Sequence, residues 1–299
     1  MKLPLFIQYN NSDITDGVGA QALRILGIYG IANHLKLGYL HQRIIKLTYQ
    51  EELSGPEPSS ESFEDLLDQV NRLFTLPSHK IPKNTICFNL YSRNLGRKML
   101  LAVIVLSLLL LIFRIRIILN VTLPFGVSDK FKNPYEIATN FVLANIPHSH
   151  MRSTPRNVLH YRTIVHTKDA ADRKILSCDY YRETVVDFAY RNGMNHLDLV
   201  VHCDIEPEAL KNSHNPRIID FLNFCESVKH LGIEIKPYAP FFETFYDMVF
   251  AEHLFISKSA FSYLAGALNR NTVIYPSEHG HPKLPGWELG HGNPNNLSI

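Results

Sequence analysis

The sequence is poor in cysteine and has no cysteine pair at the spacing of a redox or zinc motif. Its four cysteines are far apart, and no CxxC occurs. No cluster of His and Cys has metal-ligand spacing either. We therefore expect buried thiols, and neither a metal site nor a structural disulfide is supported. The four are Cys87, Cys178, Cys203 and Cys225.

A strong charge of either sign is also missing. The formal net charge is +2 over 299 residues, and no run of Lys or Arg is interleaved with aromatic residues. Nucleic acid is therefore not an expected partner. The first residues, MKLPLFIQYNN, contain a short apolar run and no small-residue cleavage site, so no cleavable signal peptide is predicted. We expect a first β-strand over Leu5–Tyr9 instead.

The fingerprint of a dinucleotide site is incomplete. Gly17 and Gly19 follow the first strand within DGVGAQ (Asp16–Gln21), and a helix is predicted over Ala22–Leu37. Strand, Gly-x-Gly loop and helix form the geometry of a phosphate or sugar-nucleotide loop, although a plain tight turn would explain the glycines equally well. No third glycine is close by, and the next apolar run, Arg43–Thr48, does not end in an acid. An NAD site is therefore disfavoured.

One long apolar run interrupts the first half of the chain. Met99–Phe113 is apolar apart from Ser107, with Arg97 and Lys98 before it and Arg114 after it. A helix that crosses a bilayer needs about 20 apolar residues, and this run is shorter. It predicts a fully buried helix or a segment at a membrane surface, with a true membrane span as the alternative. Localisation stays open on this evidence.

The length and the 45% hydrophobic content predict two domains, 1–150 and 151–299. In the second, short apolar runs alternate with helical patterns, which indicates an α/β fold with a parallel sheet. The predicted strands are Arg156–Tyr161, Leu197–Cys203, Ile233–Pro237, His253–Ser257 and Thr272–Tyr275. The predicted helices of the chain include Phe63–Leu76, Tyr135–Ala144, Tyr180–Tyr190, Pro216–Leu231 and Phe241–Phe250.

Ligands of such sheets bind at the carboxyl ends of the strands. His160, Arg162 and Asp204 occupy those positions in this interpretation. A hydroxyl-rich turn follows the strand at His253–Ser257 and contains Ser257, Ser259 and Ser262. Hydroxyls and free backbone N–H groups at a helix N-terminus suit phosphate. An ordinary βαβ corner is the alternative.

Three motifs resemble those of one enzyme family. LHYR (Leu159–Arg162), followed by DYYRETVVDF (Asp179–Phe188), resembles the HxR strand and following Tyr-Tyr helix of fucosyltransferase-type glycosyltransferases. Ile256–Tyr263 is similar to their I-S-x-S-x-F-S-W/Y motif, and Asp16–Gln21 resembles their GxGNQ loop. The α1,2-fucosyltransferase family (family 11-like) gives the best match, and the protein O-fucosyltransferases are more distant. No resemblance covers residues 54–146.

The resemblance implies the GT-B fold, in which two Rossmann-like domains have parallel sheets that face each other across a cleft. The N-terminal domain would bind the acceptor and the C-terminal domain the nucleotide sugar. It implies an inverting, metal-independent transfer from a GDP- or UDP-linked sugar, with fucose favoured, to a hydroxyl of a glycan or glycoconjugate. No other cofactor is implied.

The resemblance also assigns roles to residues. Arg162 matches the arginine that binds pyrophosphate, with a salt bridge as the alternative. Ser259, Phe261 and Ser262 match the donor-binding turn, where Phe261 would pack beneath the base or in the core. We place Ser257, Gly17, Gly19 and His160 in the same donor site. Asp204 would reach the ribose or cap a turn.

An acceptor hydroxyl is deprotonated by a carboxylate in many inverting transfers. Asp16, beside the glycine loop, is the candidate base, and Asp13 is the second. A turn-capping aspartate is the alternative for both. His279, His281 and His291 lie in a Gly/Pro-rich tail. The HGH segment has no third metal ligand at a useful spacing, so we expect a donor-site loop or a disordered tail.

The sequence departs from the family where HxRRxD and GxGNQ are expected. Thr163 and Val165 replace the second arginine and the aspartate, and Ala20 replaces the asparagine. These losses weaken the assignment of fucose as the donor sugar, and they favour an inactive protein that binds a nucleotide sugar as a second class. A third class, a membrane-anchored structural protein, is favoured by the apolar run Met99–Phe113 alone.

Overall fold

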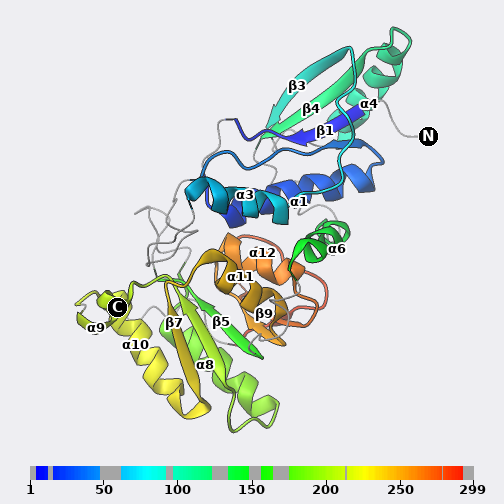
Figure 1. Cartoon of the computed structure of the whole chain (residues 1–299). Helices are drawn as coiled ribbons and strands as arrows, with labels where there is room; N and C mark the ends of the chain where they lie inside the picture. The colour runs from blue at the N-terminus through cyan, green and yellow to red at the C-terminus, as the bar shows by residue number, and fades with distance from the viewer. Residues whose placement is uncertain are drawn as a thin grey trace. The chain divides into compact units, whose positions relative to one another are not determined.

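The computed structural model describes residues 5–12, 16–47, 62–91, 97–122, 134–147, 156–163, 175–212, 214–277 and 279–291 (Figure 1). The chain forms two compact units. Unit 1 comprises Met1–Gln50 and Glu61–Pro147, and unit 2 comprises Glu51–Ser60 and His148–Ile299. Each unit is built on its own parallel sheet, so the predicted α/β class with two parallel sheets is confirmed.

The sheet of unit 1 has four parallel strands in the order β2-β1-β4-β3. These are β1 (Leu5–Tyr9), β2 (Gly38–Leu40), β3 (Thr85–Tyr91) and β4 (Arg116–Thr122). The helices are α1 (Val18–His34), α3 (Phe63–Leu73), α4 (Arg97–Leu111) and α6 (Glu136–Asn145).

Helix α1 is the core helix of unit 1, because nearly every side chain from Val18 to Ala32 is buried. It packs against β1 on one side and α6 on another. The approach of α6 is close enough that a Cβ added at Gly30 would lie 1.8 Å from the carbonyl oxygen of Pro134. Glycine at this position lets the two segments touch.

The sheet of unit 2 has six parallel strands in the order β10-β9-β8-β5-β6-β7. They are β5 (Asn157–Tyr161), β6 (Leu199–Cys203), β7 (Ile233–Pro237), β8 (His253–Phe255), β9 (Thr272–Tyr275) and β10 (Glu288–Leu289). The helices are α8 (Cys178–Arg191), α9 (Pro207–Asn212), α10 (Pro216–Val228), the short 3-10 helix Lys229–Leu231, α11 (Phe241–Phe250) and α12 (Ala260–Leu268).

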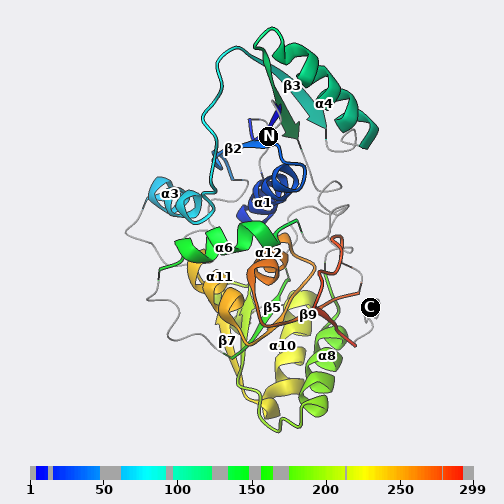
Figure 2. The same ribbon diagram turned by 90° about the vertical axis from the view of Figure 1, so that its right-hand side faces the viewer.

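This strand order is that of a doubly wound Rossmann sheet. The chain starts at β5 in the middle, moves outward through β6 and β7, then returns to β8 and moves outward in the other direction. Helices α8 and α10 pack together on one face, and α11 and α12 pack together on the other (Figure 2). The topological switch point therefore lies between β5 and β8, where ligands of such sheets bind.

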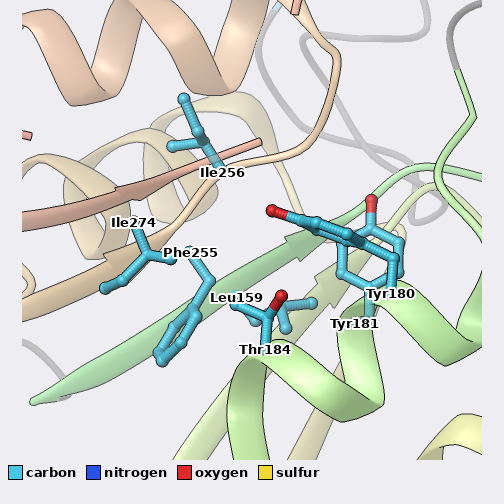
Figure 3. A pocket seen from close by; sticks show the side chains of 7 residues that line it. All are labelled: Leu159, Tyr180, Tyr181, Thr184, Phe255, Ile256 and Ile274. Atoms are coloured by element: carbon cyan, nitrogen blue, oxygen red, sulfur yellow. The ribbon is translucent and has the colours of Figure 1, made fainter. Parts of the chain in front are cut away.

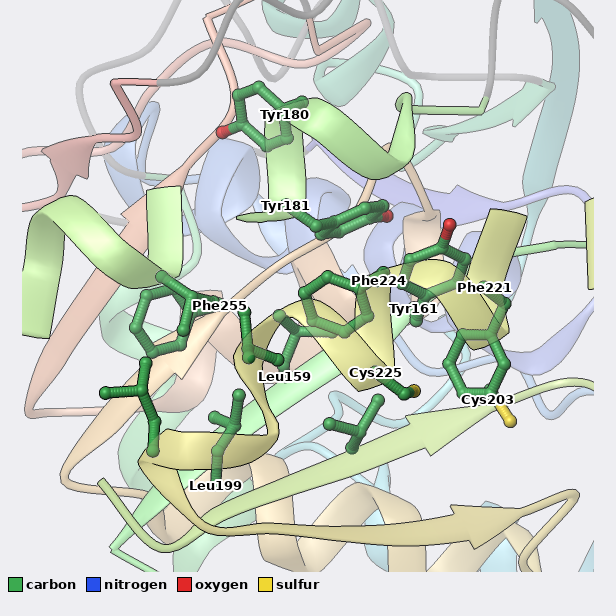
Figure 4. Packing of buried hydrophobic residues seen from close by; sticks show 14 of the residues in the cluster. Leu159, Tyr161, Tyr180, Tyr181, Leu199, Cys203, Phe221, Phe224, Cys225 and Phe255 are labelled. Atoms are coloured by element: carbon green, nitrogen blue, oxygen red, sulfur yellow. The ribbon is translucent and has the colours of Figure 1, made fainter. Parts of the chain in front are cut away.

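An aromatic core fixes the end of β5. Tyr161 packs against Tyr181 and Phe221, with ring centroids 4.3 and 4.8 Å apart, and Phe224 lies beside them (Figure 4). Side chains alternate across a strand. His160 therefore faces the α11–α12 side, and Arg162 follows at the end of the strand.

Several sequence predictions need correction. Helix α1 starts at Val18 rather than Ala22, so Gly19 lies inside the helix and not in a loop. The strand that follows α1 is β2 (Gly38–Leu40), and residues 43–47 of the apolar run Arg43–Thr48 form no strand. Because β2 lies at the sheet edge and needs only three residues, its sequence signal is weak.

Two more corrections concern exposure. The helix within Met99–Phe113 is not fully buried, since Leu109 is 57% exposed and Ile112 77%. Among the described residues, no helix has both the length and the apolar character to cross a bilayer. Cys87, expected to be buried, is exposed, and all four cysteines are free thiols.

Candidate functional site

The switch point of unit 2 carries the predicted donor residues. Arg162 directly follows β5, and the turn after β8 leads through Ser257 and Ser259 into α12. Parallel pairing of β5 and β8 brings the two segments to the same edge of the sheet, although 97 residues separate Arg162 from Ser259.

Arg162 and Ser259 form the centre of this site. The Nη1 atom of Arg162 donates a hydrogen bond to Ser259 Oγ at 2.9 Å. The same oxygen accepts from the backbone N–H of Phe261 at 3.2 Å and caps the N-terminus of α12. A guanidinium and the positive end of a helix dipole thus meet at one hydroxyl, an arrangement that favours an anion.

The positive charge of Arg162 is not cancelled within the part of the chain that the structure describes. No ion pair joins it to a described carboxylate, and its Nε atom is buried without a hydrogen-bond partner. A buried donor left unpaired costs about 1–3 kcal/mol, so such groups call for an explanation. Two phosphate oxygens would satisfy the planar donor fork of an arginine.

His160 supports the turn rather than the chemistry. Its Nδ1 lies 2.8 Å from Ser257 Oγ, which in turn lies 3.2 Å from Ser262 Oγ. Burial lowers the pKa of His160 to about 3, and the charge of Arg162 acts in the same direction. The ring is therefore neutral at physiological pH and positions Ser257 by a hydrogen bond.

Phe261 packs into an aromatic group on α11. Its ring centroid lies 5.1 Å from that of Phe241 and 6.0 Å from that of Phe245, and the edge of His160 approaches at 5.8 Å. Of the two roles expected for Phe261, core packing is the one that these contacts provide. The packing holds the first turn of α12 in place beside Arg162.

Asp204 ties two strand ends together. Its Oδ1 accepts hydrogen bonds from the backbone N–H of Thr163, at 2.8 Å, and from the Thr163 hydroxyl. Thr163 thus links the end of β5 to Asp204 after β6. Val165 and Asp169 lie outside the described residues.

His279 and His281, expected in a donor-site loop or a disordered tail, lie near the turn. His279 lies close to the backbone of Ser257 and Ser259, and its Nε2 is buried without a hydrogen-bond partner. Burial lowers the pKa of His279 to about 3, with a further contribution from His281. The segment packs on Tyr263 with ring centroids 5.1 and 4.7 Å away, so these two histidines are ordered parts of unit 2.

A buried polar network lies one strand further along. His202 on β6 contacts Asp247 on α11 at 3.0 Å, and Lys236 on β7 contacts the same carboxylate oxygen at 3.0 Å. Burial acts to raise the pKa of Asp247, but the hydrogen bonds from His202 and Lys236 outweigh it and lower the pKa. No local sequence pattern signals this network, because its members come from three separate elements.

The residues predicted in the glycine loop lie in unit 1. Asp16 forms an ion pair with the buried Arg24 at 2.6 Å, while Gly17 is the N-cap of α1. Gln21 donates to the carbonyl oxygens of Asp16, at 2.9 Å, and Lys46, at 2.6 Å. Asp16 is still 45% exposed at its side chain, and Asp13 lies outside the described residues.

The strand ends of unit 1 carry neutral amides. Asn10 donates to Thr122 Oγ1 at 3.1 Å. A ladder of amides also crosses the sheet, with Gln8 donating to Asn120 at 3.1 Å and Asn120 to Asn89 at 2.9 Å. The amides lie in register on neighbouring strands.

A crevice beneath the switch point is not a ligand site. It is lined by the apolar parts of β5, β8 and α8 and is too narrow to admit a water molecule (Figure 3). It belongs to the packing between sheet and helix. The lining residues are Leu159, Tyr180, Tyr181, Thr184, Phe255, Ile256 and Ile274. Among the described residues, no group of three or more His, Cys, Asp or Glu could hold a metal ion.

Comparison with known proteins adds likeness of fold. No protein-family profile and no curated protein matches the sequence. Among solved structures, an E. coli heptosyltransferase WaaC with ADP-2-deoxy-2-fluoro heptose is 9% identical, with 98% of this chain and 95% of that chain covered and a TM-score of 0.41. POFUT1 in complex with GDP is 12% identical, covers 97% and 99%, and has a TM-score of 0.41.

A third structure, the E. coli ADP-heptose lps heptosyltransferase II, is 7% identical, covers 97% and 90%, and has a TM-score of 0.40. TM-scores below 0.5 decide neither activity nor substrate. The fold of this chain rests on its own two sheets, and its resemblance to the fucosyltransferases stays a prediction from the motifs.

Proposed function

We propose that the protein is a glycosyltransferase that takes its sugar from a nucleotide sugar bound at the switch point of unit 2. The observation that carries the proposal is the meeting of Arg162 with the capped N-terminus of α12. An anion placed there would pair with a guanidinium whose Nε is otherwise unsatisfied. A nucleoside diphosphate fits this chemistry, and the motif resemblance supports the same assignment.

The proposed reaction is an inverting transfer. An acceptor hydroxyl attacks the anomeric carbon, the bond from that carbon to the diphosphate oxygen breaks, and the nucleoside diphosphate leaves with the bonding electrons. Arg162 and the dipole of α12 would stabilise the charge that develops on the diphosphate, a task that needs no metal ion. A glycan or glycoconjugate is the proposed acceptor, and fucose from a GDP-linked donor is favoured over a UDP-linked sugar.

Asp16 is the proposed base that removes the acceptor proton. Its carboxylate is 45% exposed and is held in place by the contact with Arg24 at 2.6 Å, so an acceptor hydroxyl could reach it. An inactive protein that binds a nucleotide sugar is the second candidate. At residue 163, where the fucosyltransferases have a second arginine, this chain has a threonine that hydrogen-bonds to Asp204.

The test combines binding with turnover. A thermal-shift screen with GDP, UDP, ADP and their sugars identifies the base, since a ligand that binds the folded state raises the melting temperature. Release of nucleoside diphosphate from the matching sugar is then measured for the wild type and two variants. We expect Arg162→Ala to lower release about 10²–10³-fold, and Arg162→Lys to recover little because lysine lacks the planar fork.

Arg182→Ala is the matched control, because Arg182 is a half-exposed arginine of the same unit that pairs only with Asp179 among the ion pairs described. The control should bind and react as the wild type does. Binding without turnover on any acceptor would favour the second candidate. No shift with any nucleotide would refute both.

A further inference from the structure

Unit 1 exposes a group of large apolar side chains, here called the α4 face. It consists of one stripe of helix α4, the turn after it and the edge strand β3. Leu109 is 57% exposed, and Ile112 and Phe113 are 77% and 72% exposed. The other members are Ile86, Phe88, Val105, Leu106 and Leu108. Soluble surfaces rarely gather so many large apolar side chains in one place.

Helix α4 buries its polar residue and exposes apolar ones, whereas a surface helix normally does the reverse. Ser107, the only polar residue between Met99 and Phe113, is completely buried. Its hydroxyl donates to the Ile104 carbonyl oxygen at 2.7 Å, so it needs no water. Val105, Leu106 and Leu109 lie on the outer stripe at the i, i+1 and i+4 positions. The polar side chain thus faces the protein and the apolar ones face outward.

The length of α4 excludes a crossing of the bilayer. Its 15 residues span about 22 Å at 1.5 Å per residue, whereas the hydrocarbon core is about 30 Å thick. After the helix the chain turns at Arg114, which has a positive φ of 56°, and enters β4 of the sheet. Both ends of α4 are therefore tied to the same sheet, through β3 and β4.

The stretch of sequence that carries the α4 face has charges of one sign. Between residues 77 and 128 the sequence has no Asp or Glu. Arg97 and Lys98 are the first two residues of α4, and Arg114 and Arg116 follow it. The remaining basic residues of this stretch are Lys80, Lys83 and Arg93.

We propose that the α4 face docks onto a lipid surface that carries anionic headgroups, with α4 lying in the boundary between headgroups and acyl chains. An apolar stripe bordered by Lys and Arg is the pattern of a helix that lies in this boundary, and anionic lipids attract such basic residues. A second copy of the chain fits less well, because two α4 faces would bring basic residues of the same sign together.

Vesicle co-sedimentation of the full chain tests the proposal. The vesicles contain phosphatidylcholine alone or with a quarter phosphatidylserine. We expect binding to the anionic vesicles, and loss of most of it in 1 M salt, where charges are screened beyond about 3 Å. The double variant Leu106→Glu/Leu109→Glu should reduce the partition coefficient by about tenfold or more.

The matched control is Ile219→Glu/Leu222→Glu on α10, whose side chains are 44% and 38% exposed in unit 2. It adds the same two charges and should bind vesicles nearly as the wild type does. Equal loss in both double variants would overturn the proposal, because net charge alone would explain it. Absence of sedimentation with any vesicle would also overturn it.

A second readout does not depend on a disruptive variant. The native Trp287 is buried, so a Leu109→Trp variant adds one exposed indole whose emission should shift to the blue with anionic vesicles only. An unchanged spectrum would contradict insertion. Light scattering without lipid measures the oligomeric state. If the wild type is a dimer and the Leu106→Glu/Leu109→Glu variant is a monomer, the α4 face binds a second copy of the chain instead of a lipid surface. None of these outcomes depends on nucleotide binding.

Discussion

Units 1 and 2 are both built on a parallel sheet, but they carry different polar groups at the ends of their strands. In unit 2, Arg162 donates to a neutral hydroxyl, and its charge remains available for an anion. In unit 1, the buried Arg24 is paired with Asp16, and Asn10 and Thr122 present an amide and a hydroxyl. A parallel sheet thus supplies the location, and the side chains decide whether that location suits an anionic or a neutral ligand.

The outer helices differ in the same way. Helix α12 of unit 2 is covered, and its apolar residues from Tyr263 to Ala265 are completely buried. Helix α4 of unit 1 exposes four large apolar side chains, those of Val105, Leu106, Leu108 and Leu109. Both helices link neighbouring parallel strands, so the connection alone does not determine what covers a helix.

The largest expected effect compares one substitution on these two helices. Leu264→Ala on α12 removes a fully buried side chain and should lower the free energy of unfolding by about 2–5 kcal/mol. Leu109→Ala on α4 removes a side chain that is 57% exposed and should change it by no more than about 0.5 kcal/mol. Urea unfolding monitored by circular dichroism measures both. Similar losses for the two variants would mean that α4 is covered in the folded protein.

The next effect is a response to acid that belongs to unit 2. Burial lowers the pKa of both His160 and His279 to about 3, from an ordinary value of 6.5. The unfolded state therefore binds more protons below pH 6.5, and stability is lost as the pH falls from 6.5 towards 3. At pH 5 each histidine should cost about 2 kcal/mol.

Urea unfolding at pH 7.5 and pH 5 measures this loss for the wild type and for His160→Asn. The variant should lose about 2 kcal/mol less than the wild type between the two pH values, whatever its stability at pH 7.5. Hydrogen exchange should also show that amides of unit 2 lose protection before those of unit 1. An equal loss in both proteins would show that His160 does not resist protonation.

The smallest expected effect compares two helix caps. Ser259 caps α12 in unit 2, and Ser62 caps α3 in unit 1 through a reciprocal bond with Asp65. Either serine replaced by alanine should cost about 1 kcal/mol of stability. Only Ser259→Ala should also weaken nucleotide binding, because it alone removes a partner of Arg162. Melting temperatures measured with and without nucleotide distinguish the effect on stability from the effect on binding. If the nucleotide raises the melting temperature equally in both variants, Ser259 does not contribute to the donor site.

Much of unit 2 could be predicted from its sequence. The strands Ile233–Pro237 and Thr272–Tyr275 and the helix Phe241–Phe250 have the predicted bounds. Proline and glycine at the ends of these short runs mark where each element stops. The end of β5 at Tyr161 was predicted, and β8 ends at Phe255, two residues before the predicted end at Ser257. The grouping of His160 and Arg162 with the serine turn followed from the parallel sheet.

Less of unit 1 could be predicted from its sequence. Strand β3 was not predicted, because it is an edge strand with Ile86 and Phe88 both exposed and without the pattern of a buried strand. Strand β4 was missed because its apolar residues follow Met99–Phe113 almost directly. The direction in which α4 faces could not be inferred either, since a run that is apolar on all sides has no period to show which side is covered.

Individual hydrogen bonds could not be predicted from the sequence either. The link from Thr163 to Asp204 and the contact from His202 to Asp247 join elements that are 41 and 45 residues apart. Such pairs depend on which strands are neighbours and on how helices cover them. Local patterns of residues carry no information on either.

The position of β5 in the sheet has a consequence for the order in which the protein assembles. Arg162 emerges from the ribosome 97 residues before its partner Ser259. Until β8 is synthesised, β5 can pair only with β6, and its other edge presents unpaired backbone groups to any passing strand. The proposed anion site at Arg162 would therefore be among the last features of unit 2 to form. A chain that stops short of β8 would leave one edge of β5 open at the centre of the sheet and would be prone to aggregate.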